Sequence, residues 1–416
     1  MNSRRSSLIT ILVILFGILL LGGLVWFGAQ LAKQDLGGGR FWIEWISARA
    51  RLVDGLSPYS AAVSERIQQR VDNLFSWAPG PTPHFTSPVY ATIVSLPFVF
   101  VPDPVWAHAA WMVAQAVLVL VTLLAYTRLV AWKPAWWVYA LICILILLSL
   151  RAVITWLEGS LVIWVAALIA AFFLALRGRR YELAGICLAL TMIMPQAVIL
   201  FVLYALLWAA LQRKAAVIVW FFSTLFLLSL VGLLLVPDWL IEYLRILWNF
   251  SSNFGSGTPG YAFQSWWPGL GRQLGWVLTS LLVVILLVEW RLSLRHDTRW
   301  FLWTASLTLT FSPWIGIPSS PEAHWLLTLP LLLVLAMFEE RWKHSAKWVG
   351  LIGVGLIFVW EWSLFLGSVS GGEPAMRLGL IFPLPLLLLI GLFWVRWWAI
   401  RPKSLLIDEL RASEML

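Results

Sequence analysis

Charged residues and cysteines are both scarce in this chain of 416 residues. Asp, Glu, Lys and Arg make up only 12% of the sequence, whereas 61% of the residues are hydrophobic. A soluble domain of this size could not cover its surface with so little charge, so most of the chain is expected to face lipid. The two cysteines, Cys143 and Cys187, lie inside apolar runs without a CxxC motif, which argues against a structural disulfide and against a thiolate-bound metal.

Motifs of soluble enzymes are also missing. The sequence has no glycine-rich phosphate loop, no cluster of metal-ligating residues and no Ser-His-Asp arrangement, which disfavours a nucleotide-sugar enzyme and a hydrolase. No cofactor and no metal are therefore predicted. The net charge of +9 does not predict nucleic-acid binding, because the basic residues are dispersed among short connections and form no patch.

What is present is a series of apolar runs that predict about twelve membrane-spanning helices. The first, Ile9 to Leu31, is long enough to cross the bilayer as a signal anchor. A shorter run, Ala91 to Val101, is broken by Pro97 and is predicted to be re-entrant or interfacial. The fold class is predicted to be an all-α polytopic membrane helical bundle, with residues 1–416 in a single integral membrane domain. The other runs are Val105 to Val130, Ala135 to Leu150, Ser160 to Leu176, Glu182 to Met194, Ala197 to Leu211, Ala215 to Val236, Gly275 to Trp290, Trp300 to Phe311, Ala323 to Phe338, Trp348 to Leu366 and Leu378 to Trp394.

Basic residues concentrate on alternate connections between these runs. Cytoplasmic connections of membrane proteins are enriched in Lys and Arg, so this alternation predicts that both termini lie in the cytoplasm, beneath the plasma membrane. The basic connections hold Arg128 and Lys133, Arg177 to Arg180, Arg213 and Lys214, Arg291 to Arg299, Arg341 to Lys347, and the tail from Arg396 to Lys403.

Three connections on the opposite, external side are long enough to build a site: residues 32–104, residues 237–274 and the stretch from Ser312 to Glu322. In the first of them, Phe41 to Val53 is predicted to form a helix closed by Gly55. Ser57-Pro58 predicts the start of a second helix that runs to about Phe75. This helix is amphipathic, and it would either lie flat on the membrane near a lipid-held substrate or brace the bundle. Its apolar face would comprise Ala62, Ile67, Val71 and Leu74.

Arg40 and Glu44 are four residues apart and would share one face of the first of these helices. An exposed ion pair at this spacing contributes only about 0.3–0.5 kcal/mol, so stability is a weak reason for its presence. Near a membrane boundary, the Glu44 carboxylate is a candidate general base and Arg40 a candidate phosphate ligand. A plain surface ion pair is the alternative.

Other ionisable residues lie near span ends on the same side, where charge is costly and often functional. Arg151 and Glu158 are predicted to bracket one tight turn, so a local ion pair is the alternative to a binding role. His324, beside Glu322, is either a base or a capping residue. Pro195-Gln196 is predicted to break an apolar stretch into a hairpin, where freed carbonyls and an amide could contact a polar ligand; an ordinary turn is the alternative.

Short motifs follow one another in a defined order along the chain. They are Arg40-Phe41 with Trp45, Gly55-Leu56-Ser57-Pro58-Tyr59, Phe85-Thr86-Ser87-Pro88, Glu158-Gly159-Ser160, and Ala184-Gly185 through Ala189-Leu190 to Met194-Pro195-Gln196. In this order they resemble the multi-spanning glycosyltransferases of family 87, which use polyprenyl-phosphate-linked sugars, typically mannose. The resemblance implies a GT-C-like fold, a glycan or glycolipid acceptor, and an inverting transfer in which a carboxylate removes the proton of the acceptor hydroxyl.

The chain departs from the family pattern at three polar positions. The presumed catalytic Asp of the family aligns with Arg40, its Lys before Pro-Gln aligns with Met194, and its amide after Gly aligns with Ser160. Glu44 or Asp35 is predicted to replace the lost Asp as base. The alternative function is a degenerate relative that binds a lipid-linked sugar or a partner enzyme, and a lipid transporter ranks third. The predicted substrate-binding residues are Arg40, Arg49, Tyr59, Arg151, Glu158, Gln196 and His324.

Overall fold

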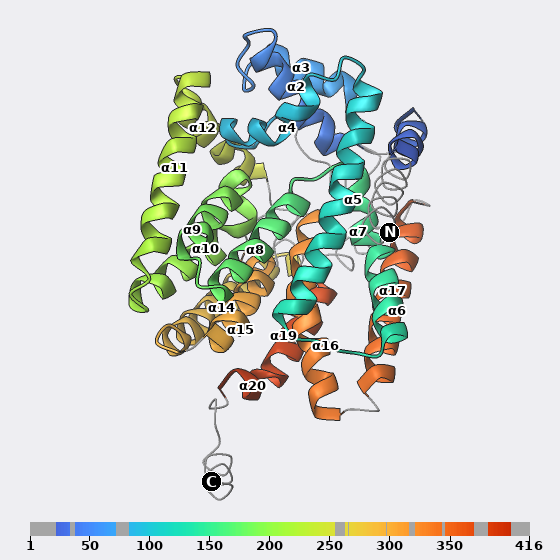
Figure 1. Ribbon diagram of the computed structural model, residues 1–416, viewed down its shortest axis with the longest axis vertical. Coiled ribbons are helices and arrows are strands. Elements are labelled where there is room, and N and C mark those ends of the chain that lie inside the picture. Colours follow the sequence, from blue (N-terminus) through green and yellow to red (C-terminus); the bar gives the residue numbers. More distant parts are fainter. Residues whose placement is uncertain are drawn as a thin grey trace, which may run out of the picture.

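The computed structural model of the protein describes residues 22–33, 38–71, 83–253, 263–264, 266–296, 298–315, 321–342, 346–369 and 382–400. Every regular element in these ranges is helical, as the sequence predicted (Figure 1). Asp35 and most of the first predicted span lie outside the described residues.

The helices divide into a small group at one end and a long bundle (Figure 1). The group at the end, which comes from the predicted first loop, comprises α2 (Gly39–Leu52), α3 (Ala61–Arg70), η1 (Val89–Ala91) and α4 (Thr92–Val99). The bundle comprises α5 (Pro104–Leu129), α6 (Trp136–Leu147), α7 (Leu150–Glu158), α8 (Val162–Arg177), α9 (Tyr181–Leu190), η2 (Thr191–Ile193), α10 (Pro195–Leu211), α11 (Ala215–Leu235), α12 (Trp239–Asn253), α14 (Gly271–Ser293), α15 (Thr298–Phe311), η4 (Ser312–Ile315), η5 (Pro321–Leu327), α16 (Thr328–Trp342), α17 (Ala346–Val369), α19 (Pro383–Trp394) and α20 (Arg396–Ile400).

Five helices among the described residues are long and apolar enough to cross a membrane, or six if the bent pair α6–α7 counts as one span. Further apolar helices, such as α8, α10 and α19, have 16, 17 and 12 residues and are shorter than a usual membrane span. The outward surface is apolar as well: on α11, the exposed fractions of Phe226 and Leu234 are 71% and 76%. Because large apolar side chains in such number are unfavourable in water, the bundle belongs in a bilayer.

Hydrogen bonds show that the basic connections gather at one end of the bundle. Arg177 donates to the carbonyl of Arg128, and Lys214 donates to the hydroxyl of Tyr181. The side-chain amide of Gln212 donates to the carbonyl of His296, which adds the α14–α15 connection to the same group. This end is opposite to α2, because α5 begins directly after α4 and carries Arg128 in its last turn. Four of the basic connections predicted from the sequence therefore lie together at the end opposite to α2.

The second helix of the predicted first loop differs from expectation in its start and its packing. Helix α3 begins at Ala61 with Ser60 as N-cap, because Ser57-Pro58 forms a turn in which the Ser60 amide donates to the Ser57 carbonyl. Its buried side chains, Val63 and Ile67, pack in one cluster with residues of α2, whereas Ala62 is exposed. The described apolar side of α3 is thus covered by protein, which agrees with the bracing alternative and not with the membrane alternative, whereas Leu74 lies outside the described residues.

The break at Pro195 is present as predicted. Helix α9 passes into the short helix η2, Met194 leaves the helical region with φ −136° and ψ 71°, and Pro195 occupies the first position of α10, where its missing N–H costs no hydrogen bond. The carbonyl of Met192, at the break, accepts a hydrogen bond of 2.9 Å from the Tyr90 hydroxyl. The break therefore connects the bundle to η1.

Candidate active site

The first turn of α2 is held against the end of α7 by a carboxylate. The backbone amides of Gly39 and Arg40 donate to the Glu158 carboxylate, and the amide of Gly38 donates to the Leu157 carbonyl at 2.8 Å. Unsatisfied amides at a helix N-terminus favour a negative charge, so Glu158 serves as an external cap of α2. A Cβ at Gly39 would lie 2.6 Å from Oε2 of Glu158, so this approach requires glycine.

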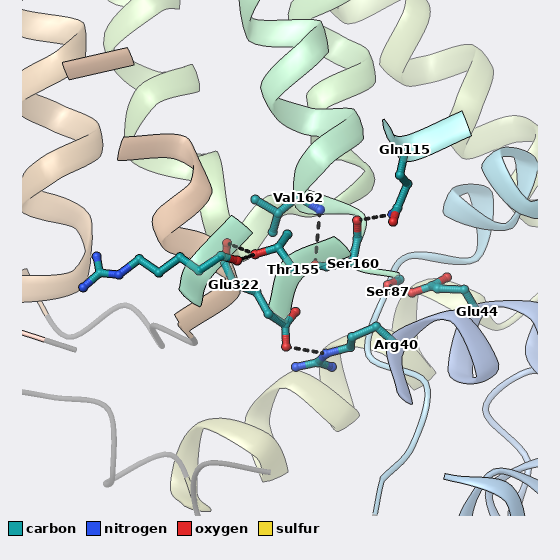
Figure 2. Close-up of polar contacts among 9 residues, drawn as sticks. Arg40, Glu44, Ser87, Gln115, Thr155, Ser160, Val162 and Glu322 are labelled. Carbon is teal, nitrogen blue, oxygen red and sulfur yellow. Dashed lines mark hydrogen bonds and ion pairs between the residues drawn. The ribbon is translucent and has the colours of Figure 1, made fainter. Parts of the chain in front are cut away.

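The Arg40 side chain continues from this turn toward the far part of the chain. Its Nε lies 3.5 Å from Oε1 of Glu322 in η5, and the exposed fractions of the two side chains are 35% and 8% (Figure 2). The negative charge of Glu322, with smaller contributions from Glu158 and Glu44, raises the pKa of Arg40 above its ordinary value. Arg40 is therefore a cation facing three carboxylates.

Glu44 lies one turn further along α2 and is buried, with an exposed fraction of 6%. Ser87 donates a hydrogen bond of 2.5 Å to its Oε1, and Oε2 is buried without a hydrogen-bond partner among the described residues (Figure 2). Burial raises the pKa of Glu44 to about 7, although Ser87 and Arg40 act in the opposite direction. A carboxylate with this pKa is suited to exchange a proton near neutral pH.

Tyr59 supports this carboxylate through Ser87. Its hydroxyl donates to the Ser87 carbonyl at 2.9 Å, and burial raises its pKa, so it stays protonated as a donor. Substrate binding by Tyr59 stays a prediction. In the structure, its hydrogen bond fixes the segment that carries Ser87, whose hydroxyl is bound to Glu44.

Helix α7 presents a polar stripe to η5. Arg151, Thr155 and Glu158 follow one another at spacings of four and three residues, which places them on one helix face, and all three are buried. The Thr155 hydroxyl lies 2.6 Å from the Arg151 carbonyl and 3.4 Å from the Glu322 carbonyl. The predicted tight turn between Arg151 and Glu158 was wrong, because Ser149 caps a new helix there and α6–α7 bends by 54°.

The predicted local ion pair between Arg151 and Glu158 is also absent from the described contacts. Nε of Arg151 lies 3.0 Å from Oε1 of Glu361 in α17, with both side chains buried. Residues 151 and 158 share one helix face but are separated by about two turns, too far for direct pairing. Each of them therefore pairs with a residue on a neighbouring element. Glu361 thereby joins α17 to α7.

A small cavity of about 40 Å³ lies between α6, α7, η5 and α17. Arg151, His324 and Glu361 are its ionisable lining residues, and most of the other lining residues are apolar, such as Leu145 and Ile357. His324 is buried. Glu44 does not line this cavity. The structure therefore contains two separate polar groups: Glu44 with Arg40 on α2, and Arg151 with His324 in the cavity.

Two other predicted substrate ligands lie apart from these groups. The Arg49 guanidinium stacks over the Trp45 ring at 5.2 Å, and nine residues of helix turn it to the opposite side of α2 from Arg40. Gln196 is half-buried at the start of α10, and its Oε1 has no hydrogen-bond partner among the described residues.

The Gly159-Ser160 motif serves packing and hydrogen bonding at the end of α7. Gly159 has a left-handed φ of 71°, and a Cβ there would lie 2.7 Å from Cβ of Phe41. The carbonyl of Gly159 accepts a hydrogen bond from the Trp111 indole of α5. The carbonyl of Ser160 accepts one from the side-chain amide of Gln115, also of α5 (Figure 2). This corner therefore locks α2, α5 and α7 together beside Glu158.

Sequence reasoning missed Ser87 as a partner of Glu44 and Glu361 as a partner of Arg151. A signal for Glu361 was available, because it is a single carboxylate in the middle of the apolar run from Trp348 to Leu366, where charge is costly. Ser87 was noted only as part of the Phe85-Thr86-Ser87-Pro88 motif, and nothing in that motif indicates that its hydroxyl meets Glu44.

The comparisons with known proteins agree with the resemblance. The family model for glycosyltransferase family 87 matches residues 85–313, more than half of the chain. The matched range includes Arg151, Glu158 and Gln196, and it excludes Arg40, Glu44 and Glu322. No curated protein and no solved structure matches the chain.

Proposed function

The chain belongs to glycosyltransferase family 87, and from this premise we propose that it transfers a sugar of the mannose class from a polyprenyl-phosphate donor. The acceptor in this proposal is a lipid-linked or glycan hydroxyl at the external face of the plasma membrane. Family membership and the apolar helices support a membrane glycosyltransferase in general. The donor, the acceptor and the inverting course of the reaction are the proposed parts.

The observation that carries the proposal is the Glu44 carboxylate. It is buried on α2 beside a cation, its pKa is raised to about 7, and one of its oxygens has no partner among the described residues. In the proposed reaction, this carboxylate takes the proton of the acceptor hydroxyl. The acceptor oxygen then forms a bond to the anomeric carbon as the bond from that carbon to the phosphate oxygen breaks, and polyprenyl phosphate leaves with the electron pair.

A departing phosphate requires cationic partners, because the charge that develops on it must be met by groups already in place. We assign this role to Arg151, which shares with the buried His324 a cavity whose remaining lining is largely apolar, as a lipid-linked donor needs. Both arginines already face carboxylates, Arg151 facing Glu361 and Arg40 facing Glu322, and we choose Arg151 because it lines this cavity. In this proposal Arg40 holds Glu322 and Glu158 beside Glu44.

The proposed topology follows the basic connections. We propose about twelve spans, with both termini in the cytoplasm and α2–α4 outside, because cytoplasmic connections carry most Lys and Arg. The hydrogen-bonded group of Arg128, Arg177 and Lys214 lies at the end opposite to α2 and supports this orientation. An impermeant thiol reagent added to intact cells should label a cysteine introduced at exposed Glu65 of α3. Labelling only after permeabilisation would reverse the orientation.

The activity is tested with purified protein in lipid, radiolabelled polyprenyl-phosphate-mannose and a membrane extract as the source of acceptor. The wild-type chain should transfer label, and Glu44→Gln should lower the rate about 100-fold or more, the usual contribution of a general base. Glu65→Gln is the matched control, because Glu65 is an exposed carboxylate of the same loop. Transfer that survives Glu44→Gln would reject this residue as the base.

One observation favours a second candidate function. Arg40 stands where the resemblance places the catalytic Asp, and its side chain is engaged with Glu322. A chain that had lost catalysis would still bind a lipid-linked sugar or a partner enzyme. Absence of transfer with several donors, together with retained binding of polyprenyl-phosphate-mannose in the same vesicles, would favour this binding function.

A further inference from the structure

Helix α12 follows the membrane-capable helix α11 after a linker of three residues and turns back over its end. Gly232 of α11 lies directly beneath the Trp239 indole, since a Cβ at Gly232 would be 2.9 Å from Nε1 of Trp239. The Trp239 ring also meets Tyr90 of η1 edge-on, with ring centroids 5.6 Å apart. Helix α12 is therefore fixed at the end of the molecule where α2–α4 lie (Figure 1).

The inner side of α12 contacts the predicted first loop. The Ser57 hydroxyl donates a hydrogen bond of 3.0 Å to Oε2 of Glu242. Tyr243 is buried near Tyr59 and, after burial itself, contributes to raising the pKa of Tyr59. Ser57 and Tyr59 belong to the Gly55–Tyr59 turn, and Tyr59 supports Ser87, the hydrogen-bond donor to Glu44. Helix α12 is thus connected to the candidate active site by a short series of contacts.

The outer side of α12 is apolar and exposed. The exposed fractions of Leu240, Ile241, Leu244 and Trp248 are 51%, 62%, 55% and 78%. At about 100° per residue these four side chains occupy one arc of roughly 100°. The next exposed position around the helix is Arg245, at the edge of this arc.

This surface continues the surface of α11 that a membrane protein turns toward lipid. Leu230, Leu233 and Leu234 of α11 are exposed by 41%, 49% and 76%, and the chain passes from them into α12 through Val236. A helix with such an apolar arc, an aromatic residue and a basic residue at its edge suits the boundary between lipid headgroups and acyl chains. Arg245 could there reach lipid phosphates while its neighbours contact acyl chains.

We propose that α12 is an interfacial helix whose Leu240–Trp248 face is embedded in one leaflet of the bilayer and holds the Glu44 site at the membrane surface. The occupant of this face is phospholipid. The inference concerns membrane contact and does not depend on which sugar is transferred. It replaces α3, whose apolar side is covered by α2, as the surface helix of this protein.

The test uses Ile241→Cys labelled with a polarity-sensitive NBD fluorophore in phosphatidylcholine–phosphatidylglycerol vesicles. Glu65→Cys on the polar side of α3 is the matched control, and the unsubstituted protein, labelled in parallel, corrects for Cys143 and Cys187. We expect blue-shifted emission at position 241, strong quenching by lipids spin-labelled near the headgroup, and weak quenching by iodide. The label at position 65 should be quenched by iodide instead.

Two results would overturn the proposal. Quenching of the position-241 label by iodide as strong as at position 65 would place this face in water. Shielding from both iodide and spin-labelled lipid would mean that protein covers it. Leu244→Cys, one turn further on the same face, repeats the measurement if the first variant folds poorly. Neither readout requires turnover, so loss of the proposed glycosyl transfer would leave this result interpretable.

Discussion

Arg40 and Glu322 are 282 positions apart in the sequence, yet Nε of the arginine lies 3.5 Å from Oε1 of the glutamate. Glu158 of α7 accepts hydrogen bonds from the backbone of the same α2 turn, and its charge also acts on the Arg40 guanidinium. Three segments distant in the sequence, α2, α7 and η5, therefore meet around Arg40. This relationship gives Arg40 a structural task at the position where the family resemblance places a catalytic carboxylate. It also surrounds Glu44 with charges that the sequence alone did not bring together.

Replacing Arg40 should destabilise the fold. Arg40→Met would leave Glu158 and Glu322 close together without the cation between them, at a cost on the order of 2 kcal/mol, less than for a fully buried pair because Arg40 is 35% exposed. The melting temperature in detergent measures the loss. Adding Glu322→Gln should restore part of it, and a double variant no more stable than Arg40→Met would contradict the pairing.

Glu44 should impose a pH dependence on both rate and stability. As a base it must be ionised, so transfer should decline as the pH falls below its pKa of about 7. Because the folded state raises this pKa from 4.5, the protonated form stabilises the fold. That contribution is present below about pH 4.5 and is lost as the pH rises through about 7.

The stability effect is measured as the difference in melting temperature between wild type and Glu44→Gln from pH 5 to pH 8.5. The wild type should lose stability relative to the variant as the pH rises, by an amount on the order of 3 kcal/mol over the full range between the two pKa values. A constant difference would show that burial does not perturb Glu44.

Gly39→Ala should disturb the site, although alanine normally favours helix. The new Cβ would lie 2.6 Å from Oε2 of Glu158 and would push this carboxylate away from the α2 amides. We expect a lower melting temperature and slower transfer. Gly353→Ala in α17 is the control, because its Cβ meets nothing within 4 Å and should be neutral or stabilising. Equal behaviour of the two variants would refute the contact.

Glu361→Leu should be among the most damaging single changes in α17. It would leave the buried Arg151 without its counter-ion, and breaking a buried pair in this way typically costs about 3–5 kcal/mol. The double variant Arg151→Met with Glu361→Leu should recover most of this stability while losing donor binding. Thermal melting and binding of polyprenyl phosphate separate the two effects, and an unchanged melting temperature in Glu361→Leu would disprove the pair.

Much of the architecture was predictable because it depends on local chemistry. The helical class, the α2 boundaries near Phe41 to Val53, the break before Pro195 and the grouping of basic connections all follow from runs of neighbouring residues. The single face shared by Arg40 and Glu44 follows from the helix repeat. About twelve spans remain a prediction, since five or six of the described helices meet the length and hydropathy test.

The errors arose where local patterns compete with packing. The sequence near Ser57-Pro58 is a good helix start, but two hydrogen bonds stabilise a turn there instead. The Tyr59 hydroxyl donates to the Ser87 carbonyl and the Ser57 hydroxyl donates to the Glu242 carboxylate, so α3 starts at Ala61. The amphipathic pattern of α3 was correct, but a pattern states only that a face is apolar. Whether lipid or protein covers that face depends on what else lies nearby.

The amino-acid sequence by itself determined the apolar surface and the helical class, and it predicted that four basic connections lie together, because hydropathy and helix periodicity act over a few residues. Only the tertiary structure decided that Arg40 meets Glu322, that Arg151 meets Glu361, and that Glu44 is buried against Ser87. Attraction between charges acts over a few ångströms of space and is independent of distance along the chain, so these partners appear only when the helices have packed.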